Sequence, residues 1–231
     1  MKNKNIVAVR NLIRCLDIES LRNPEVVANL VRAFGLVKWA GGTVSFGDDE
    51  IYRNKTEDMA GIYQTPDQVA EMLVYLSSFE IKALLEVGVF HGGNFLFMSE
   101  YLRRFNPDIQ CTGIDPTGYL NDEIRAIIET ELWLSFKSIT SDQVSGTKFD
   151  FVFLDGDHGA EWIKKDWQNV GQHAKICGIH DIQGPVCPPV VKFWKELKAK
   201  SKGKTMEFLK HSTVEPTKGI GMIHNAKGVK P

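Results

Sequence analysis

The chain has 231 residues, of which 43% are hydrophobic and 25% are charged, a composition typical of globular proteins. A formal net charge of -1 gives no basic field for nucleic acid, and the apolar runs are too short to cross a bilayer. The four cysteines form no CxxC pair, which is typical of reduced thiols. We therefore expect a soluble cytoplasmic protein with no nucleic-acid or membrane partner.

Residues 1–63 are predicted to form a helical N-terminal extension. Segment 23–37 places apolar residues at helical spacing after Asn23, a favoured N-terminal cap. Segment 39–64 mixes glycines, acids and aromatic residues without a clear period, so it fits either a structured loop or a lid over a substrate. The apolar helices of the extension suggest a surface for a homodimer.

Residues 64–231 are predicted to form one α/β domain, which begins with a helix capped by Thr65. Beyond residue 82, apolar strands alternate with helices, a pattern typical of parallel βαβ units. Strands are expected at 82–89, 109–115, 134–139, 149–157, 175–181, 205–210 and 218–224. Because no helix separates the last two strands, they should pair antiparallel. The fold class is therefore α/β, a doubly wound, seven-stranded and mostly parallel sheet with a reversed last strand.

Acidic residues lie at the ends of four predicted strands. They are Glu86 in the first, Asp115 in the second, Asp155 and Asp157 in the fourth, and Asp181 in the fifth. Open parallel sheets bind ligands at the carboxyl ends of their strands. Carboxylates that converge on one edge repel one another unless a polyol, a cation or a cationic ligand lies between them. The sequence therefore predicts a ligand site at this edge.

A glycine-rich turn follows the first strand in the segment LLEVGVFHGGN, residues 84–94. Gly88 permits a tight turn, and Gly92 with Gly93 would let a helix start approach a ligand closely. The spacing differs from the dinucleotide fingerprint GxGxxG, and a plain strand-to-helix turn is the alternative. Asp115 follows this turn by roughly 20 residues, the spacing at which an acid binds ribose hydroxyls in nucleotide-binding folds.

The motifs LLEVGVFHGGN, GIDP, FDFVFLDGDH and GIHD resemble those of class I S-adenosylmethionine-dependent methyltransferases. The branch with the greatest resemblance contains small-molecule and sugar O-methyltransferases, many of which use Mg²⁺. The resemblance spans residues 64–224 and implies S-adenosylmethionine as cofactor and a small-molecule acceptor as partner. The residues that it places around the donor are Glu86, Gly88, His91, Gly92, Asp115, Ser141, Asp142 and Asp155.

The acceptor hydroxyl must lose a proton, and His158 beside Asp155 is the expected general base because imidazole titrates near neutral pH. Either residue could instead cap the next helix. Asp155 and Asp181 would hold Mg²⁺, with Asp157 or His180 as a third ligand. Ile182 stands where metal-dependent relatives carry a second oxygen ligand, so the ligand set is incomplete.

The expected acceptor contacts are Tyr63 and Gln64, which precede the first strand, and Trp162 in a later helix. Tyr52 and Arg53 are further candidates in segment 39–64, and a solvated loop is the alternative there. Two other functions compete with methyl transfer. One is an NAD-type oxidoreductase, against which the glycine spacing and the reversed strand argue. The other is a non-catalytic domain that binds a metabolite or a protein partner.

Overall fold

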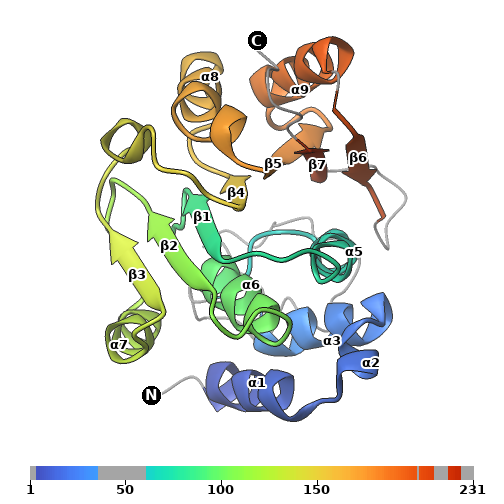
Figure 1. The fold of residues 1–231 in the computed structure, drawn as a ribbon, viewed down its shortest axis with the longest axis vertical. Helices are drawn as coiled ribbons and strands as arrows, with labels where there is room; N and C mark the ends of the chain where they lie inside the picture. Colours follow the sequence, from blue (N-terminus) through green and yellow to red (C-terminus); the bar gives the residue numbers. More distant parts are fainter. Residues whose placement is uncertain (1–3, 36–60, 202, 211–217, 225–231) are drawn as a thin grey trace.

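A seven-stranded sheet crosses the centre of the molecule in a computed structural model that describes residues 4–35, 61–201, 203–210 and 218–224 (Figure 1). The strand order is β3-β2-β1-β4-β5-β7-β6. The strands are β1 (Ala83–Val87), β2 (Gln110–Ile114), β3 (Leu134–Lys137), β4 (Phe151–Leu154), β5 (Ile176–Gln183), β6 (Thr205–Phe208) and β7 (Lys218–His224). Strands β1 to β5 pair in parallel, whereas β7 runs antiparallel to both β5 and β6. The predicted doubly wound sheet is confirmed.

Helices cover both faces of this sheet (Figure 1). One face carries α8 (Ala160–Asn169) and α9 (Pro188–Lys200), and the other carries α5 (Pro66–Leu76), α6 (Gly93–Arg103) and α7 (Asp122–Thr130). Two short 3-10 helices, η1 (Ser141–Val144) and η2 (Gly171–His173), follow β3 and α8. No helix in the described part of the chain is long and apolar enough to cross a membrane.

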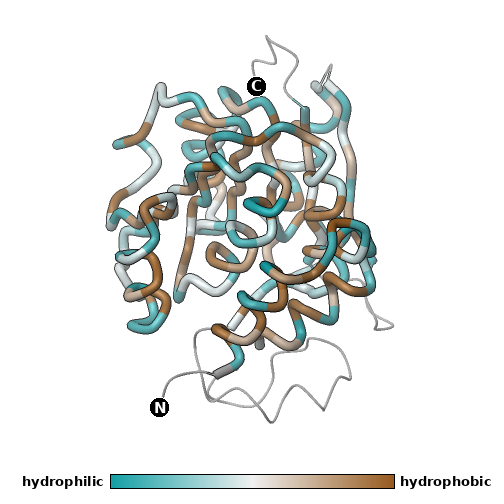
Figure 2. The backbone as a smooth tube through the Cα atoms, turned by 60° about the horizontal axis from the view of Figure 1, so that its bottom comes forward, coloured by the Kyte–Doolittle hydropathy of each residue, from teal (hydrophilic) through white to brown (hydrophobic). Residues whose placement is uncertain are grey.

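The alternation of side chains along the buried strands divides the core in two. In β4, Phe151 and Phe153 pack with α5 and α6, whereas Val152 and Leu154 pack with α8 and α9. Along the helices, hydrophobic and hydrophilic segments alternate (Figure 2), as expected for helices that each bury one face. A continuous apolar strand such as β4 is therefore explained by burial on both sides.

The N-terminal helices α1 (Lys4–Cys15), α2 (Ile18–Leu21) and α3 (Pro24–Phe34) pack outside α5 and α6. The predicted cap is present, since Oδ1 of Asn23 accepts a hydrogen bond from the Glu25 amide at 2.9 Å. Arg10 donates from Nε to Oε1 of the buried Glu100 at 2.6 Å and so ties α1 to α6. Apolar residues of α1 and α3 such as Ile6, Val9 and Phe34 are buried within the chain, whereas Val7 and Leu12 of α1 are exposed. A homodimer and the domain limit at residue 63 stay predictions.

Strand β5 is longer than the sequence predicts. It continues to Gln183, two residues past the expected end at Asp181, because its pairing with β7 shifts register between His180 and Gln183. Asp181 adopts φ 58° at this irregularity, in the left-handed region. His180 and Asp181, which were expected to end the strand, therefore lie inside β5 at a bulge.

Candidate functional site

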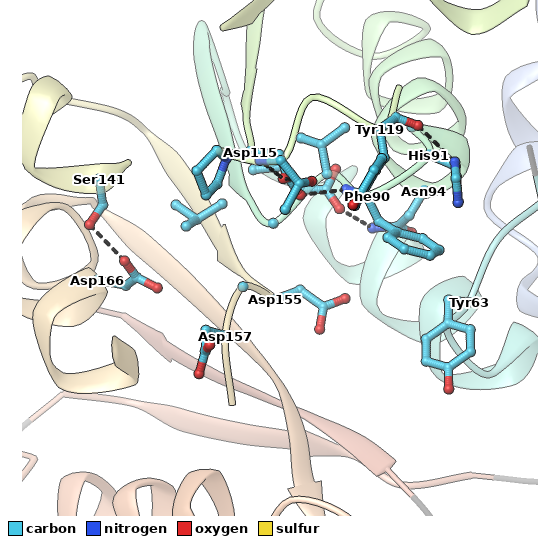
Figure 3. Close-up of a pocket in the computed structure, with 18 of the residues that line it drawn as sticks. Tyr63, Phe90, His91, Asn94, Asp115, Tyr119, Ser141, Asp155, Asp157 and Asp166 are labelled. Atoms are coloured by element: carbon cyan, nitrogen blue, oxygen red, sulfur yellow. Dashed lines mark hydrogen bonds between the residues drawn. The ribbon is translucent and has the colours of Figure 1, made fainter. Parts of the chain in front are cut away.

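A pocket of about 500 Å³ lies at the carboxyl ends of β1, β2 and β4 (Figure 3). Its lining includes most of the residues that the sequence predicts for a ligand site, namely Tyr63, Gln64, Glu86, Gly88, His91, Gly92, Asp115, Ser141, Asp155, Asp157, His158 and Trp162. Asp142, His180 and Asp181 are not part of this lining. The fold thus brings together residues from five separate segments of the chain, as the rule for open parallel sheets requires.

The backbone conformation at Gly88 agrees with the predicted tight turn, and the protein itself approaches both glycines closely. A Cβ at Gly88 would lie 2.1 Å from the carbonyl oxygen of Asp155, and Gly88 has φ +87°. A Cβ at Gly92 would lie 2.5 Å from Cδ1 of Leu120, with φ +95°. The protein itself fills the space beside both glycines. The missing side chain at Gly92 therefore leaves room for Leu120, and a ligand contact at Gly92, which lines the pocket, stays a prediction.

Glu86 is fully buried on β1, beneath the glycine turn. Nδ2 of Asn94 donates to its Oε1 at 2.8 Å, whereas Oε2 of Glu86 and Oδ1 of Asn94 have no hydrogen-bond partner among the described residues (Figure 3). Burial raises the pKa of Glu86 well above its ordinary value, and the bond from Asn94 opposes this only in part. An unsatisfied buried carboxyl group is costly, so this pair suits a ligand that brings a hydrogen-bond donor or a positive charge.

Asp115 directly follows β2 and links two loops at the pocket wall. Its Oδ2 accepts a hydrogen bond from the Phe90 amide at 2.8 Å, and its Oδ1 accepts from the Thr117 amide at 2.9 Å and from the Thr117 hydroxyl (Figure 3). Each carboxylate oxygen has two lone pairs, so Oδ2 can accept one further bond. His91 is held by the Tyr119 carbonyl oxygen, 2.7 Å from Nδ1. Whether it also contacts a donor stays a prediction.

Asp166 is a pocket residue that the sequence analysis missed. It lies on α8, where its Oδ1 accepts a hydrogen bond from the hydroxyl of Ser141 at 2.6 Å, and burial raises its pKa (Figure 3). It stands next to the buried Trp167 and three residues after the buried Ile163, so its helical position faces inward. Asp142, the residue after Ser141, is exposed and accepts a hydrogen bond from the Thr140 hydroxyl.

Four side chains form what we call the Asp-His cluster: Asp155 and His158, which line the pocket, and His180 and Asp181, which belong to β5. Nδ1 of His180 lies 2.9 Å from Oδ1 of Asp155 and 3.5 Å from Oδ2 of Asp181. Nε2 of His158 lies 3.0 Å from Oδ2 of Asp181 and 3.7 Å from Oδ1 of Asp155. Gln64 donates to the other oxygen of Asp155. The predicted approach of Asp155 and Asp181 from neighbouring strands is thus observed.

These contacts argue against the general-base role predicted for His158. The carboxylates of Asp155 and Asp181 raise the pKa of His158 to about 10, so its imidazole is protonated at neutral pH and cannot take a proton from an acceptor. Burial works to raise the pKa of Asp155, but the imidazoles of His180 and His158 outweigh it and hold that pKa below its ordinary value. Asp155 is therefore ionised and can accept a hydrogen bond.

The cluster does not fit Mg²⁺. This ion prefers six oxygen ligands in a near-octahedral arrangement. Among the described residues two groups could hold a metal ion, Asp155 with His180 and Asp181, and His158 with Asp181 and Cys187, and each mixes carboxylate with imidazole or thiol ligands. Asp157 does not join them, because its Oδ1 accepts a hydrogen bond from the Gly159 amide at 2.7 Å and holds the turn into α8. That turn was expected to use Asp155 or His158, so this alternative is also wrong.

The predicted acceptor contacts Tyr63, Gln64 and Trp162 all line the pocket. Trp162 is 43% exposed, with Nζ of Lys165 4.6 Å from its ring centre. Lys218 donates to the Tyr63 carbonyl oxygen at 2.8 Å, and its Nζ lies 3.6 Å from the centre of the Tyr63 ring. These contacts fix the segment that carries Tyr63 and Gln64. Tyr52 and Arg53 lie outside the described residues.

No family model matches the sequence, and no curated protein matches it either. Solved structures do match its fold. The O-methyltransferase from Bacillus cereus in complex with S-adenosylhomocysteine is 12% identical, with a TM-score of 0.54 over 97% of this chain and 100% of that one. The Podospora anserina methyltransferase PaMTH1 is 11% identical, with a TM-score of 0.54 over 96% and 87% of the two chains. The O-methyltransferase TomG from Streptomyces achromogenes is 14% identical, with a TM-score of 0.52 over 70% and 80%. The chain therefore has the fold of class I S-adenosylmethionine-dependent methyltransferases.

Proposed function

We propose that the protein is an S-adenosylmethionine-dependent methyltransferase that methylates a hydroxyl group of a small molecule or sugar. The observation that carries the proposal is the buried, half-satisfied Glu86 beside Asp115 in one pocket of about 500 Å³ at the carboxyl ends of β1 and β2. Its fold is shared with O-methyltransferases whose structures contain S-adenosylmethionine or S-adenosylhomocysteine. The glycine spacing remains an argument against an NAD enzyme.

The donor would lie across the ends of three strands. Oε2 of Glu86 and Oδ1 of Asn94 would receive hydrogen bonds from its ammonium group, which supplies the donors that this buried pair lacks. Oδ2 of Asp115 would accept a bond from a ribose hydroxyl. The paired Ser141 and Asp166 would meet the exocyclic amine of adenine, because a carboxylate is an acceptor that suits an amine donor.

When bound, S-adenosylmethionine supplies a methyl group on a sulfonium cation, and transfer needs mainly alignment of the acceptor oxygen with that methyl. Asp155 is the residue that we assign to alignment, since it lines the pocket as an ionised acceptor for the substrate hydroxyl. Tyr63, Gln64 and Trp162 would bound the acceptor. The proposed reaction uses neither His158 as a base nor Mg²⁺.

Calorimetric titration with S-adenosylhomocysteine tests the donor site. We expect binding to the wild-type protein and a loss of at least about tenfold in affinity for Asp115→Asn, which removes a charged acceptor. The matched control is Asp108→Asn, at an exposed aspartate before β2, which should bind as the wild type does. Equal affinity of all three proteins, or no binding, contradicts the proposal, and binding of NADH in its place would favour an oxidoreductase.

Acceptor identity needs a second experiment. Release of S-adenosylhomocysteine from S-adenosylmethionine is measured with panels of sugars, phenols and other hydroxyl compounds, and with amines as the comparison. Turnover with a hydroxyl compound supports O-methylation. Turnover with amines alone would assign N-methylation. Donor binding without turnover on any compound would favour a non-catalytic binding domain.

A further inference from the structure

Gln64 carries an unpaired polar atom at the pocket, apart from those of Glu86 and Asn94. The residue lines the pocket, although only 4% of it is exposed. Its Nε2 donates a hydrogen bond to Asp155, whereas its buried Oε1 has no hydrogen-bond partner among the described residues. A buried acceptor without a donor is costly, so this oxygen suits a ligand that brings a hydrogen-bond donor.

The orientation of the Gln64 amide follows from the chemistry of its neighbour. An ionised carboxylate has no proton and can only accept hydrogen bonds, and the imidazoles of His180 and His158 keep Asp155 ionised. The amide nitrogen of Gln64 must therefore face Asp155, which leaves the amide oxygen as the unpaired end. Because both amide atoms are bonded to the same carbon, Oε1 of Gln64 lies close to the carboxylate of Asp155.

The backbone on both sides of Gln64 is tied to strand β7. Nζ of Lys218 donates to the Tyr63 carbonyl oxygen at 2.8 Å and lies 3.6 Å from the centre of the Tyr63 ring. The amide of Gly219 donates to Oε1 of the buried Gln68 in α5 at 3.0 Å. The segment that carries Gln64 is thus held in place before a ligand binds, which lowers the entropic cost of binding.

Gln64 lies at the acceptor end of the pocket, as the proposed function divides it. Figure 3 shows Tyr63 and the pair of Ser141 and Asp166 at opposite sides of the view, with Asp155 between them. The pair is the proposed adenine contact. Gln64 follows Tyr63 in the chain and bonds to Asp155, so it belongs to the end that is distant from adenine.

We propose that Gln64 is a specificity-determining residue that selects acceptors with a second hydrogen-bond donor next to the reacting hydroxyl. This inference rests on the proposed function. Oδ2 of Asp155 has a lone pair beyond the one that Gln64 uses and accepts from the reacting hydroxyl, while Oε1 of Gln64 accepts from the neighbouring hydroxyl or amine. Two adjacent acceptors match two adjacent donors, so the substrate class is vicinal diols and vicinal amino alcohols. A site built around a hydrogen bond rejects ligands that lack it.

Matched pairs of compounds test this selection. Each pair joins a compound that has both donors with the same compound in which hydrogen replaces the second group. The pairs are a vicinal cyclohexanediol or aminocyclohexanol with cyclohexanol, and a methyl pyranoside with its deoxy analogue. Calorimetry measures their binding to protein saturated with S-adenosylhomocysteine, and release of S-adenosylhomocysteine from S-adenosylmethionine gives kcat/KM. We expect the member with two donors to exceed its partner at least about tenfold in both measurements.

A variant assigns the preference to Gln64. Gln64→Met keeps the length of the side chain and removes Oε1, so it should lower the preference to less than about twofold and leave S-adenosylhomocysteine affinity unchanged. Gln168→Met is the matched control, at an exposed glutamine of α8 outside the pocket lining, and should keep the preference. The wild-type comparison needs no variant, so it decides the proposal even if Gln64→Met does not fold.

Three results would overturn the proposal. They are no preference or no binding in any pair, a preference that survives in Gln64→Met, and a loss of S-adenosylhomocysteine affinity in that variant, which would place Gln64 at the donor. Each leaves the donor site at Glu86 and Asp115 intact, so the proposed function would stand. Absence of S-adenosylhomocysteine binding to the wild-type protein would overturn the proposed function and this inference with it.

Discussion

Replacing Gly88 with alanine tests what fixes the turn between β1 and α6. The new Cβ would lie 2.1 Å from the carbonyl oxygen of Asp155 and 2.4 Å from Cα of Gly156. Both atoms belong to the backbone after β4, so they cannot move aside as a flexible side chain would. Gly88 also has φ +87°, a conformation that L-residues rarely adopt. The substitution therefore combines backbone strain with a steric clash.

Gly146→Ala separates these two costs. Gly146 has φ +81° but nothing within 4 Å of an added Cβ, so its substitution carries the conformational cost alone, about 1–2 kcal/mol. The clash at Gly88 adds about 1–3 kcal/mol, the usual cost of overpacking a rigid site. We expect the free energy of unfolding to fall by about 2–5 kcal/mol in Gly88→Ala. The decrease should lie at the upper end of this range because the added Cβ clashes with backbone atoms.

Urea unfolding followed by circular dichroism gives both values. The same variants are titrated with S-adenosylhomocysteine at a temperature where they are folded. Relief of the clash must displace the segment of Asp155 and Gly156, which lines the pocket, so Gly88→Ala should also lose affinity while Gly146→Ala keeps it. Equal destabilisation by both substitutions would refute the reasoning, because the contact of the new Cβ with the backbone of Asp155 and Gly156 would then have no cost.

Three further outcomes are expected. Glu100→Gln should lower the free energy of unfolding in urea by about 3 kcal/mol, because it removes the buried charge that pairs with both Arg10 and Arg14; an effect under about 1 kcal/mol would mean that this network contributes little. S-adenosylhomocysteine affinity should rise with pH, because burial raises the pKa of Glu86 and the ammonium group needs its ionised form; Glu86→Gln should flatten that calorimetric pH profile, and an unchanged profile would exclude Glu86 as its cause. Asp166→Asn should weaken the same binding by about 1 kcal/mol, whereas Asp142→Asn, outside the pocket lining, should leave it unchanged; equal losses would contradict the assignment.

The sheet and its ligand edge could be predicted from the sequence because both depend on local patterns. Apolar strands buried on two faces give continuous runs such as FVFL in β4, and helices between them force parallel pairing. Parallel pairing in turn brings all carboxyl ends to one edge, so Glu86, Asp115 and Asp155 meet in one pocket although 69 residues separate the first from the last. Position along the chain was enough to predict this grouping.

The reasons for individual residues could not be predicted in the same way. Glycine in a turn indicates a close approach, but the approaching group at Gly88 is the backbone after β4, which only the folded chain brings near. Asp166 follows Lys164 and Lys165, and such charged residues are typical of a solvated helix face, whereas Ser141 and the pocket lie against Asp166. In both cases the deciding contact joins segments that are distant in sequence.

The bulge in β5 shows most clearly how a long-range contact sets the chemistry of this site. The run KICGIHD reads as a strand that ends in two polar residues, and on a regular strand His180 and Asp181 would point to opposite faces. The register shift depends on pairing with β7, where Lys218 has φ 65° opposite Gln183. At this shift the imidazole of His180 meets two carboxylates, and His158 contacts the same two carboxylates. The sequence predicts the presence of these four side chains but not their contacts, because a bulge in β5, formed where β5 pairs with β7, affects which of them meet.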